Sequence, residues 1–185
     1  HRLAMVGLTL TLTMYLVAAF AEFLAPADPL RTNSSGIYHP PQGVNFIESG
    51  EDGWRFRPYV YFYEKSRDTY TLKTTFKRSE TKKTYLEFFA VGTPYKLWGL
   101  FQLNRHLLTT ANPRERIYVL GADRLGRDVL SRSLYGARVS MSIGLVGVTL
   151  SLLLGVTLGG ISGYYGGRTD LVIQRIVEFV LSLPT

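Results

Sequence analysis

The sequence has no cysteine and only three histidines among its 185 residues. The absence of thiols excludes disulfide bonds and thiolate metal sites within the chain. The histidines are His1, His39 and His106, which are far apart, so a histidine-based metal site is not expected. No Ser/His/Asp, Cys/His or metal-binding grouping is visible, and the chain is not expected to be an enzyme. The phosphate-binding loop GxxxxGK[ST] is also absent, so no ATP site of that kind and no cofactor are predicted in this chain.

Charge is nearly absent from two long stretches of the sequence. Residues 139–165 contain no charged residue, and residues 3–24 contain only Glu22. A bilayer requires about 20 mostly apolar residues in helical form, and both stretches supply them. A secretory signal is the alternative interpretation of the first stretch, but the apolar core of a signal is usually about 7 to 15 residues long. We therefore expect two transmembrane helices, the first ended by Pro26 and Pro29.

Small residues recur at every fourth position along the second apolar stretch. Small side chains at this spacing allow the backbone of another helix to approach closely. Glycine is common in membrane helices in any case, but the length of the repeat favours a helix that packs against other helices. The residues are Gly147, Ser151, Gly155, Gly159, Gly163 and Gly167.

A third apolar segment begins after a turn expected over residues 166–170. It covers residues 171–185 and contains Arg175 and Glu178, whose spacing of three allows them to pair on one helix face. Ionisable residues inside a membrane helix usually face protein or water. The segment is shorter than the roughly 20 residues of a full span, and the chain begins at His1. We therefore expect an N-terminal fragment of a longer, polytopic, α-helical membrane protein.

The middle of the chain is basic and rich in alternating aromatic residues. Eighteen of the 21 Lys and Arg residues lie between Arg31 and Arg138, against ten acidic residues. Apolar and polar residues alternate over 55–65 and 69–78, and a further strand is expected over 83–91, with hairpin turns at 66–68 and 78–81. A basic, aromatic surface is compatible with nucleic-acid binding. The neighbouring membrane segments favour instead a solvated β-sheet near anionic lipid headgroups, and no nucleic-acid partner is expected.

The short flanks of the apolar helices predict their orientation. Arg2 precedes the first helix and Arg168 follows the second. Lys and Arg in short flanks favour the cytoplasmic side, whereas long loops are translocated largely regardless of charge. The N-terminus is therefore expected in the cytoplasm, and residues 26–137 are expected outside the cell membrane.

The stretch LGADRLGRDVLSRSLYGAR joins the β-rich region to the second helix. Gly121 and Gly126 indicate turns around Asp123. From Asp128 onward the pattern fits an amphipathic helix lying along the membrane surface, with Asp123 or Asp128 as its cap and an Asp128–Arg132 pair at i, i+4. Arg124 and Asp128 have the same spacing. The alternative is that these charges only end the membrane span.

The expected fold is thus an α-helical membrane protein with a small β-rich extracytoplasmic insert between its first two helices. The expected segments are a first transmembrane helix over residues 1–25, the insert over 26–116, the surface helix with its LGADRLGRD motif over 117–137, and the second helix with the start of a third over 138–185.

The sequence LGADRLGRDVLSRSLYGARVSMSIGL resembles the signature LGTDxLGRDxLSRxxYGARxSL of inner-membrane permease subunits of dipeptide/oligopeptide-type ABC importers. LAPADPL after the first apolar run resembles that family's end of helix one. GISGYYGGRTDLVIQRIVEFVLSLPT resembles its GYxGGxxDxxxxRxxDxxxxxP segment. Ala122 stands where the family usually has Thr, and Glu178 where it has Asp.

The resemblance implies a type I ABC importer permease in a bacterial or archaeal inner membrane. Its partners would be a second permease subunit, an extracytoplasmic solute-binding protein, and two cytoplasmic ATPases that bind ATP and Mg²⁺ and couple through a region beyond Thr185. The residues expected to form a structural collar that contacts partners are Asp123, Arg124, Gly126, Arg127, Asp128, Ser131, Arg132, Gly136 and Arg138. The alternative function is a membrane-anchored extracytoplasmic interaction protein without transport activity.

Overall fold

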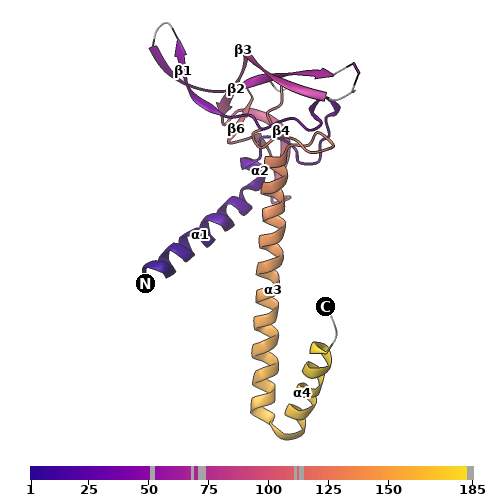
Figure 1. Ribbon diagram of the computed structural model, residues 1–185. Coiled ribbons are helices and arrows are strands. Elements are labelled where there is room, and N and C mark those ends of the chain that lie inside the picture. Colours follow the sequence, from indigo (N-terminus) through magenta and orange to yellow (C-terminus); the bar gives the residue numbers. More distant parts are fainter. Residues whose placement is uncertain (51–52, 68, 71–73, 111, 113–114, 183–185) are drawn as a thin grey trace. The chain divides into compact units, whose positions relative to one another are not determined.

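The computed structural model describes residues 1–50, 53–67, 69–70, 74–110, 112 and 115–182 (Figure 1). The chain divides into two compact units, His1–Val139 and Ser140–Thr185. Two helices in the described part of the chain are long and apolar enough to cross a membrane, judged by length and composition. They are α1 (Arg2–Ala19) and α3 (Val129–Tyr165).

The first unit contains a twisted antiparallel sheet and a separate hairpin. Within the described residues the sheet has the strand order β1-β2-β3-β6, and β4 pairs with β5 in the hairpin. The elements that accompany α1 in this unit are α2 (Ala21–Leu24), the 3₁₀ helix η1 (Ser34–Gly36), β1 (Asn45–Gly50), β2 (Gly53–Arg67), β3 (Thr74–Phe88), β4 (Val91–Leu97), β5 (Phe101–Arg105) and β6 (Leu108–Thr110).

The longest strands differ from the sequence prediction at one turn. The hairpin turn expected at 78–81 is wrong, because these residues lie inside β3 and form a bulge: Tyr61 pairs with Lys83, but Tyr63 pairs with Arg78. A strand can contain extra, unpaired residues when it pairs with its neighbour both before and after them. The two strands expected over 69–78 and 83–91 are therefore largely one strand. The other expected turn, 66–68, falls partly outside the described residues.

The apolar core of this unit is small. Val60 from β2, Leu86 from β3 and Ile117 from the segment after β6 are buried together, and Val44 and Leu108 pack against them. Full burial of such a side chain contributes about 1.5–3 kcal/mol. Because the cluster is small, polar and aromatic contacts have a large share in holding the unit together.

The alternation of basic and aromatic residues is explained by contacts inside the sheet. The Arg57 guanidinium lies 3.7 Å from the centroid of the Tyr85 ring, and Lys83 Nζ lies 4.7 Å from that of Tyr59. Lys83 Nζ is also 2.7 Å from Glu48 Oε1, which accepts a hydrogen bond from the Tyr85 hydroxyl. Cations over aromatic faces attract the ring quadrupole. These contacts hold neighbouring strands together across the sheet surface.

His39 packs into an aromatic cluster beneath the sheet. Its ring centroid lies 4.8 Å from that of Tyr118 and 4.9 Å from that of Phe76, and its Nδ1–H donates to Pro40 O at 2.7 Å. Burial lowers the pKa of His39, although the bond to Pro40 O acts in the opposite direction. The cluster is thus built around a neutral imidazole.

Acidification is expected to destabilise the first unit through His39. The folded-state pKa is lowered, so the unfolded chain binds the proton more readily, and stability is lost as pH falls below about 6.5. The melting temperature should drop by a few degrees between about pH 7.5 and about pH 5.5, and His39→Phe should remove most of that drop. His1→Gln is the control and should retain it. An unchanged pH dependence in His39→Phe would contradict this assignment.

The predicted surface helix is not a separate element. Residues 117–128 form an extended lead-in and turns, and the helix that begins at Val129 continues without interruption to Tyr165. The expectation of a distinct amphipathic helix over 117–137 is therefore wrong. No proline interrupts 129–165, and the hydrogen-bonded ladder passes through the charged positions as readily as through the apolar ones.

The second unit contains most of α3 and then α4 (Gly167–Leu181). The expected turn over 166–170 is shorter than predicted, because α4 already begins at Gly167 after a single residue, Gly166, at φ +56°. Arg175 Nη1 lies 2.7 Å from Glu178 Oε2, which confirms the pairing predicted from their spacing. A Cβ atom added at any glycine of the small-residue repeat would meet nothing within 4 Å in the described chain, so its packing role stays a prediction.

Candidate functional site

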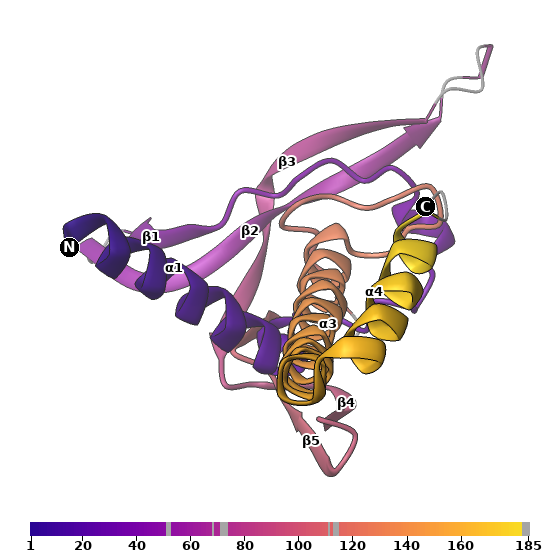
Figure 2. The same ribbon diagram turned by 90° about the horizontal axis from the view of Figure 1, so that it is seen from below.

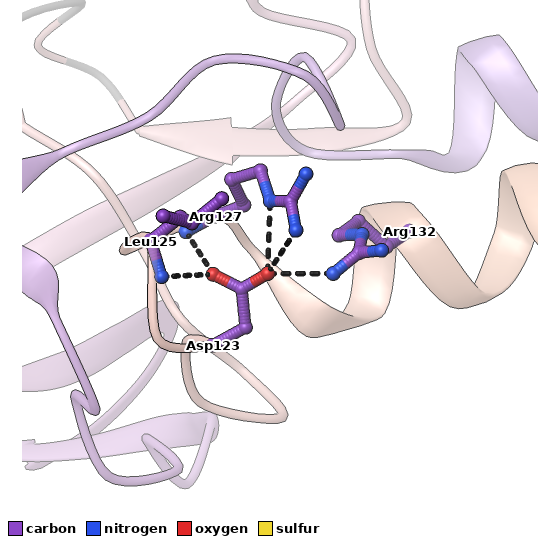
Figure 3. A network of polar contacts seen from close by, with 4 residues as sticks. All are labelled: Asp123, Leu125, Arg127 and Arg132. Carbon is purple, nitrogen blue, oxygen red and sulfur yellow. Dashed lines mark hydrogen bonds and ion pairs between the residues drawn. The ribbon is translucent and has the colours of Figure 1, made fainter.

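A tight turn around Asp123 carries the densest polar network of the collar residues (Figure 3). Asp123 Oδ1 accepts the backbone N–H groups of Leu125 at 2.8 Å and Arg127 at 3.0 Å. Asp123 Oδ2 accepts Arg127 Nε at 2.8 Å and Arg132 Nη1 at 2.5 Å. The Asp123 carboxylate thus holds the backbone of the turn and binds two arginines. One of them, Arg132, lies in the first turn of α3.

The electrostatics of the turn keep Asp123 ionised. Partial burial acts to raise the pKa of Asp123, but the bonds from the Arg127 and Leu125 backbones, the Arg127 side chain and its charge together hold that pKa well below its usual range. Hydrogen bonds to the charged form of a carboxylate have this effect. The charges of the turn are therefore matched to one another, which indicates a structural role.

Gly126 allows another segment to cross this turn at close range. Its φ is +70°, and a Cβ atom there would lie 1.9 Å from Asn33 O. The Asn33 N–H donates to Leu125 O at 3.2 Å, so the two backbones are hydrogen-bonded where they cross. At Gly121, with φ +82°, an added Cβ atom would lie 2.8 Å from His39 O, a milder clash. These glycines permit both a left-handed conformation and a backbone contact.

Asp128 caps the start of α3, as the sequence predicted for one of the two aspartates. Its Oδ2 accepts the Ser131 N–H at 2.7 Å, and it is 3% exposed. Burial raises the pKa of Asp128, and the bonds from Ser131 act in the opposite direction. The predicted Asp128–Arg132 pair is wrong, because the carboxylate faces inward to the amide while Arg132 reaches Asp123. The Arg124–Asp128 pair is also not formed between these described residues, since Arg124 points to solvent.

Two contacts tie the start of α3 to the end of the first helical segment. The fully buried Ser131 hydroxyl accepts the Ala27 N–H at 3.2 Å. Arg138 forms an ion pair with Glu22 of α2, whose side chain is only 4% exposed. We call residues 21–28 together with residues 123–138 the junction. Sequence reasoning missed Glu22 as a partner, although an ionisable residue in an apolar run was the available signal.

The structure brings most of the predicted collar residues into the contacts of the junction. All nine lie within its second segment, and seven of them make the contacts described above; Arg124 and Gly136 are exposed and take no part in those contacts. Further buried residues had no sequence signal because they lie in loops. Tyr118 accepts a bond from Asn33 Nδ2 at 2.8 Å through its hydroxyl, and its N–H donates to Gln42 Oε1 at 2.7 Å. These side chains secure the lead-in to the Asp123 turn.

The chemistry of the junction is that of a connector. Asp123, Asp128 and Glu22 each accept at least one bond from an arginine or a backbone amide, although Glu22 Oε2 and Asp128 Oδ1 are buried without a hydrogen-bond partner among the described residues. Among the residues that the structure describes, no group of three His, Asp or Glu side chains is arranged to hold a metal ion. The arrangement fixes the relative positions of the end of α2 and the start of α3.

Comparisons with known proteins identify relatives of the chain. Residues 1–41 match the family model described as the N-terminal TM domain of oligopeptide transport permease C. The dipeptide transport system permease protein DppC of Haemophilus influenzae is 49% identical over 67 residues, which cover 36% of this chain and 23% of that protein. DppC of Alkalihalophilus pseudofirmus is 33% identical over 121 residues, covering 61% and 40%. The oligopeptide transport system permease protein OppC of Bacillus subtilis is 41% identical over 80 residues, covering 43% and 26%.

The matches cover less than half of the length of each of these relatives. No solved structure matches the chain. The chain is nevertheless similar in sequence to permease subunits of dipeptide and oligopeptide transport systems, which confirms the resemblance to that family inferred from the sequence.

Proposed function

We propose that this chain forms part of a permease subunit of an ATP-driven, binding-protein-dependent importer of peptides, in which it contributes to half of the translocation pathway. The names of its relatives and the two apolar helices support this proposal. In this arrangement α1 and α3 cross the inner membrane, the N-terminus is cytoplasmic, and the β-rich insert lies outside. The partners are a second permease, two ATPases that bind ATP and Mg²⁺, and a solute-binding protein.

The junction is the structural feature that best supports a role for this chain in the permease. Two contacts join the segment of residues 21–28 to the start of α3, next to the Asp123 turn. They are the Glu22–Arg138 ion pair and the hydrogen bond from the Ala27 N–H to the Ser131 hydroxyl. Removing one member of a buried ion pair is strongly destabilising, so the pair favours the arrangement in which both members meet. We propose that the junction is a collar at the outer mouth of the pathway, which positions α3 and presents Arg124 to a partner.

The first test is purification of the tagged full-length protein from its native membranes. Recovery of a second permease and two ATPases, with a solute-binding protein captured by cross-linking, is the expected result. Recovery of an extracytoplasmic partner without ATPases would contradict the importer and support the membrane-anchored interaction protein. Uptake of labelled di- and oligopeptides by cells with and without the gene would test the substrate class.

Charge reversal at Arg127 is expected to impair both the fold of the junction and peptide uptake. In Arg127→Glu a second carboxylate lies beside Asp123, and the lost charged hydrogen bonds are worth about 1.5–3 kcal/mol each. Thermal unfolding of the purified complex and initial uptake rates are the measurements. Lys77→Glu, an exposed change of the same charge in β3, is the control; its new carboxylate faces Glu64 across the strand pair, so it should lower stability by less than about 1 kcal/mol and leave uptake unchanged. Wild-type values for both measurements in Arg127→Glu would rule out the collar.

Arg124→Glu separates partner contact from folding. Arg124 is exposed at the same turn, so the melting temperature should remain unchanged. If the collar faces a partner subunit, peptide uptake or recovery of the partner subunits should fall in Arg124→Glu but not in the Lys77→Glu control. Normal uptake and recovery would show that the outer face of the turn meets no partner.

A further inference from the structure

A strained turn lies beside the Asp123 turn. The His39 N–H donates to Gly36 O at 3.0 Å, which closes a four-residue β-turn. Its central residues are Ile37, at φ −58° and ψ 123°, and Tyr38, at φ +53°. These angles are typical of a type II turn, whose third position requires a positive φ and is normally glycine or asparagine. A tyrosine therefore occupies the position at which glycine would be least strained.

The Tyr38 side chain makes no contact that would compensate for this strain. It is 69% exposed and has no hydrogen bond, ion pair or ring contact with the described residues. The other non-glycine residues with positive φ in the described part of the chain are Phe89 and Trp98. The Phe89 ring lies 5.9 Å from that of Phe23, and Trp98 Nε1–H donates to Ala19 O at 2.8 Å. Packing thus supports the strain at those two positions and does not support it at Tyr38.

The backbone places Tyr38 next to exposed residues of the Asp123 turn. The Tyr38 N–H donates to Asp123 O at 3.2 Å, so the residues that follow Asp123 are neighbours of the tyrosine. Arg124 is exposed, and Leu125 is 44% exposed. We call Tyr38, Arg124 and Leu125 the turn surface.

The turn surface carries a positive charge that the turn does not balance. Arg127 and Arg132 both bind the Asp123 carboxylate, and Asp128 is buried at the start of α3. Arg124 has no carboxylate partner among the described residues. Charges across a protein interface are arranged to be complementary, so a partner that meets this surface presents an acidic group.

The segments around the turn surface hold it in place. The chain that follows Tyr38 runs along β2 to reach β1 (Figure 2), and Gln42 Nε2–H on this stretch donates to Tyr61 O at 3.0 Å. The Gln42 N–H donates to Tyr118 O at 2.9 Å. A backbone fixed in advance has little freedom to lose on binding. Tyrosine and arginine on such a support are typical of the residues that contribute most to protein interfaces.

The turn surface lies beyond the lipid headgroups when α3 crosses the membrane. The Asp123 turn directly precedes α3, which begins at Val129, and Arg138 is the last charged residue before the uncharged stretch. At about 1.5 Å per residue, the helix from 129 to 138 is roughly 15 Å long. The headgroup layer on one side of a bilayer is roughly 5–8 Å thick. The occupant of this surface is therefore a protein and not a lipid.

The small size of the turn surface favours a partner that binds transiently. Interfaces of permanent subunits bury about 2,000–5,000 Å² and are mainly apolar. The turn surface instead combines one cation, one phenolic ring and one leucine. A soluble protein that docks and leaves fits this composition better than a second membrane subunit.

We propose that the turn surface docks the solute-binding protein, which meets Arg124 with a carboxylate and receives the Tyr38 ring in an apolar recess. The tyrosine is kept at a glycine position because it makes this contact. The inference rests on the proposed function, which supplies a soluble extracytoplasmic partner.

Tyr38→Gly separates docking from folding. Glycine adopts a positive φ without strain and keeps the backbone N–H that bonds to Asp123 O. The melting temperature of the purified full-length complex should therefore stay within about 2 °C of the wild-type value or rise. Its affinity for the purified solute-binding protein should fall at least about tenfold. A melting temperature several degrees lower would make Tyr38 a structural residue, and an unchanged affinity would leave it without a partner; either result overturns the inference.

Photocross-linking from position 38 identifies the partner directly. The photoreactive residue p-benzoylphenylalanine replaces Tyr38 in the full-length protein, and the complex is irradiated in its native membranes. The expected product is a cross-link to the solute-binding protein. Its yield should fall at least about threefold in Arg124→Glu and also with rising salt, which screens opposite charges. Lys77→Glu is the control and should leave the yield unchanged. A cross-link only to the second permease, or no cross-link, overturns the inference.

Recovery of the ATPases separates this inference from the proposed function. A complex that contains both ATPases and imports peptides, but gives no cross-link from position 38, counts against the turn surface alone. A cross-link to a soluble extracytoplasmic protein in a complex without ATPases counts against the importer and not against docking at the turn surface.

Discussion

Replacement of Gly126 by alanine is expected to reduce the stability of the first unit by about 3 kcal/mol or more. The new Cβ atom would lie 1.9 Å from Asn33 O, which is backbone and cannot rotate away. The left-handed φ of +70° adds a further cost for any L side chain. Because Asn33 and Leu125 are hydrogen-bonded at this crossing, relief of the clash must break their contact. The measurement is denaturant or thermal unfolding of the purified protein.

Gly136→Ala is the matched control for this variant. Gly136 lies on α3, where an added Cβ would meet nothing within 4 Å of the described chain. Alanine inside a helix is favoured over glycine by roughly 0.5–1 kcal/mol, so this variant should be as stable as the wild type or slightly more stable. The two substitutions are chemically identical and ten positions apart. Equal stability of both variants would show that the Asn33 crossing is not a constraint.

Local patterns in the sequence predicted the long helices and the two longest strands of the fold, but not β1, β4, β5 or β6. The uncharged run over 139–165 predicts a long helix because hydrophobicity and length are properties of neighbouring residues. Alternation over 55–65 predicts a strand for the same reason, and β2 lies there. The Arg175–Glu178 pair follows from helical spacing alone. The turns at Gly121 and Gly126 follow from the need for positive φ, which is also a local requirement.

Competition between local interactions explains the errors. Asp128 and Arg132 have the spacing of an ion pair, but the Ser131 amide at the helix start competes for the same carboxylate and wins. The Asp123 turn then offers Arg132 a better anion. The bulge in β3 has a similar cause. Its polar residues could form a turn, but β3 pairs with β2 both before and after them, and so they stay within the strand.

A single sequence does not show which residues of two distant segments are in contact with each other. Ala27 bonds to Ser131 across more than a hundred residues, and Glu22 pairs with Arg138 over a similar separation. Such pairs depend on the path of the whole insert between them, and no periodicity records it. This is why the collar residues could be selected by motif while their partners Glu22 and Ala27 could not.

Removal of Arg138 is expected to destabilise the junction more than removal of Glu22. In Arg138→Met the Glu22 carboxylate, 4% exposed, is left as an unpaired buried charge, at a cost of about 3–5 kcal/mol. One of its oxygens, Oε2, already has no hydrogen-bond partner among the described residues. In Glu22→Gln the amide oxygen still accepts from Arg138, whose side chain is 31% exposed, so the loss should be nearer about 1 kcal/mol.

The double variant Glu22→Leu, Arg138→Met tests whether the pair is needed for stability or for transport. Replacing both members of a buried ion pair by apolar residues of similar size is often neutral or stabilising, so this protein should regain most of the stability lost in Arg138→Met. A double variant as unstable as Arg138→Met would mean that the loss comes from the Arg138 side chain itself and not from stranding the Glu22 charge.

Peptide uptake by the stable double variant then decides what the charges contribute. If the junction only fastens two helix ends, an apolar contact should serve equally well and uptake should remain at the wild-type rate. If α3 must change its position relative to α2 during transport, the directional Glu22–Arg138 bond selects between arrangements in a way that a nonspecific apolar contact cannot. Uptake should then fall severalfold in a protein of normal stability. We expect the second outcome, because a buried charge pair is a costly means of fastening where leucine and methionine would suffice.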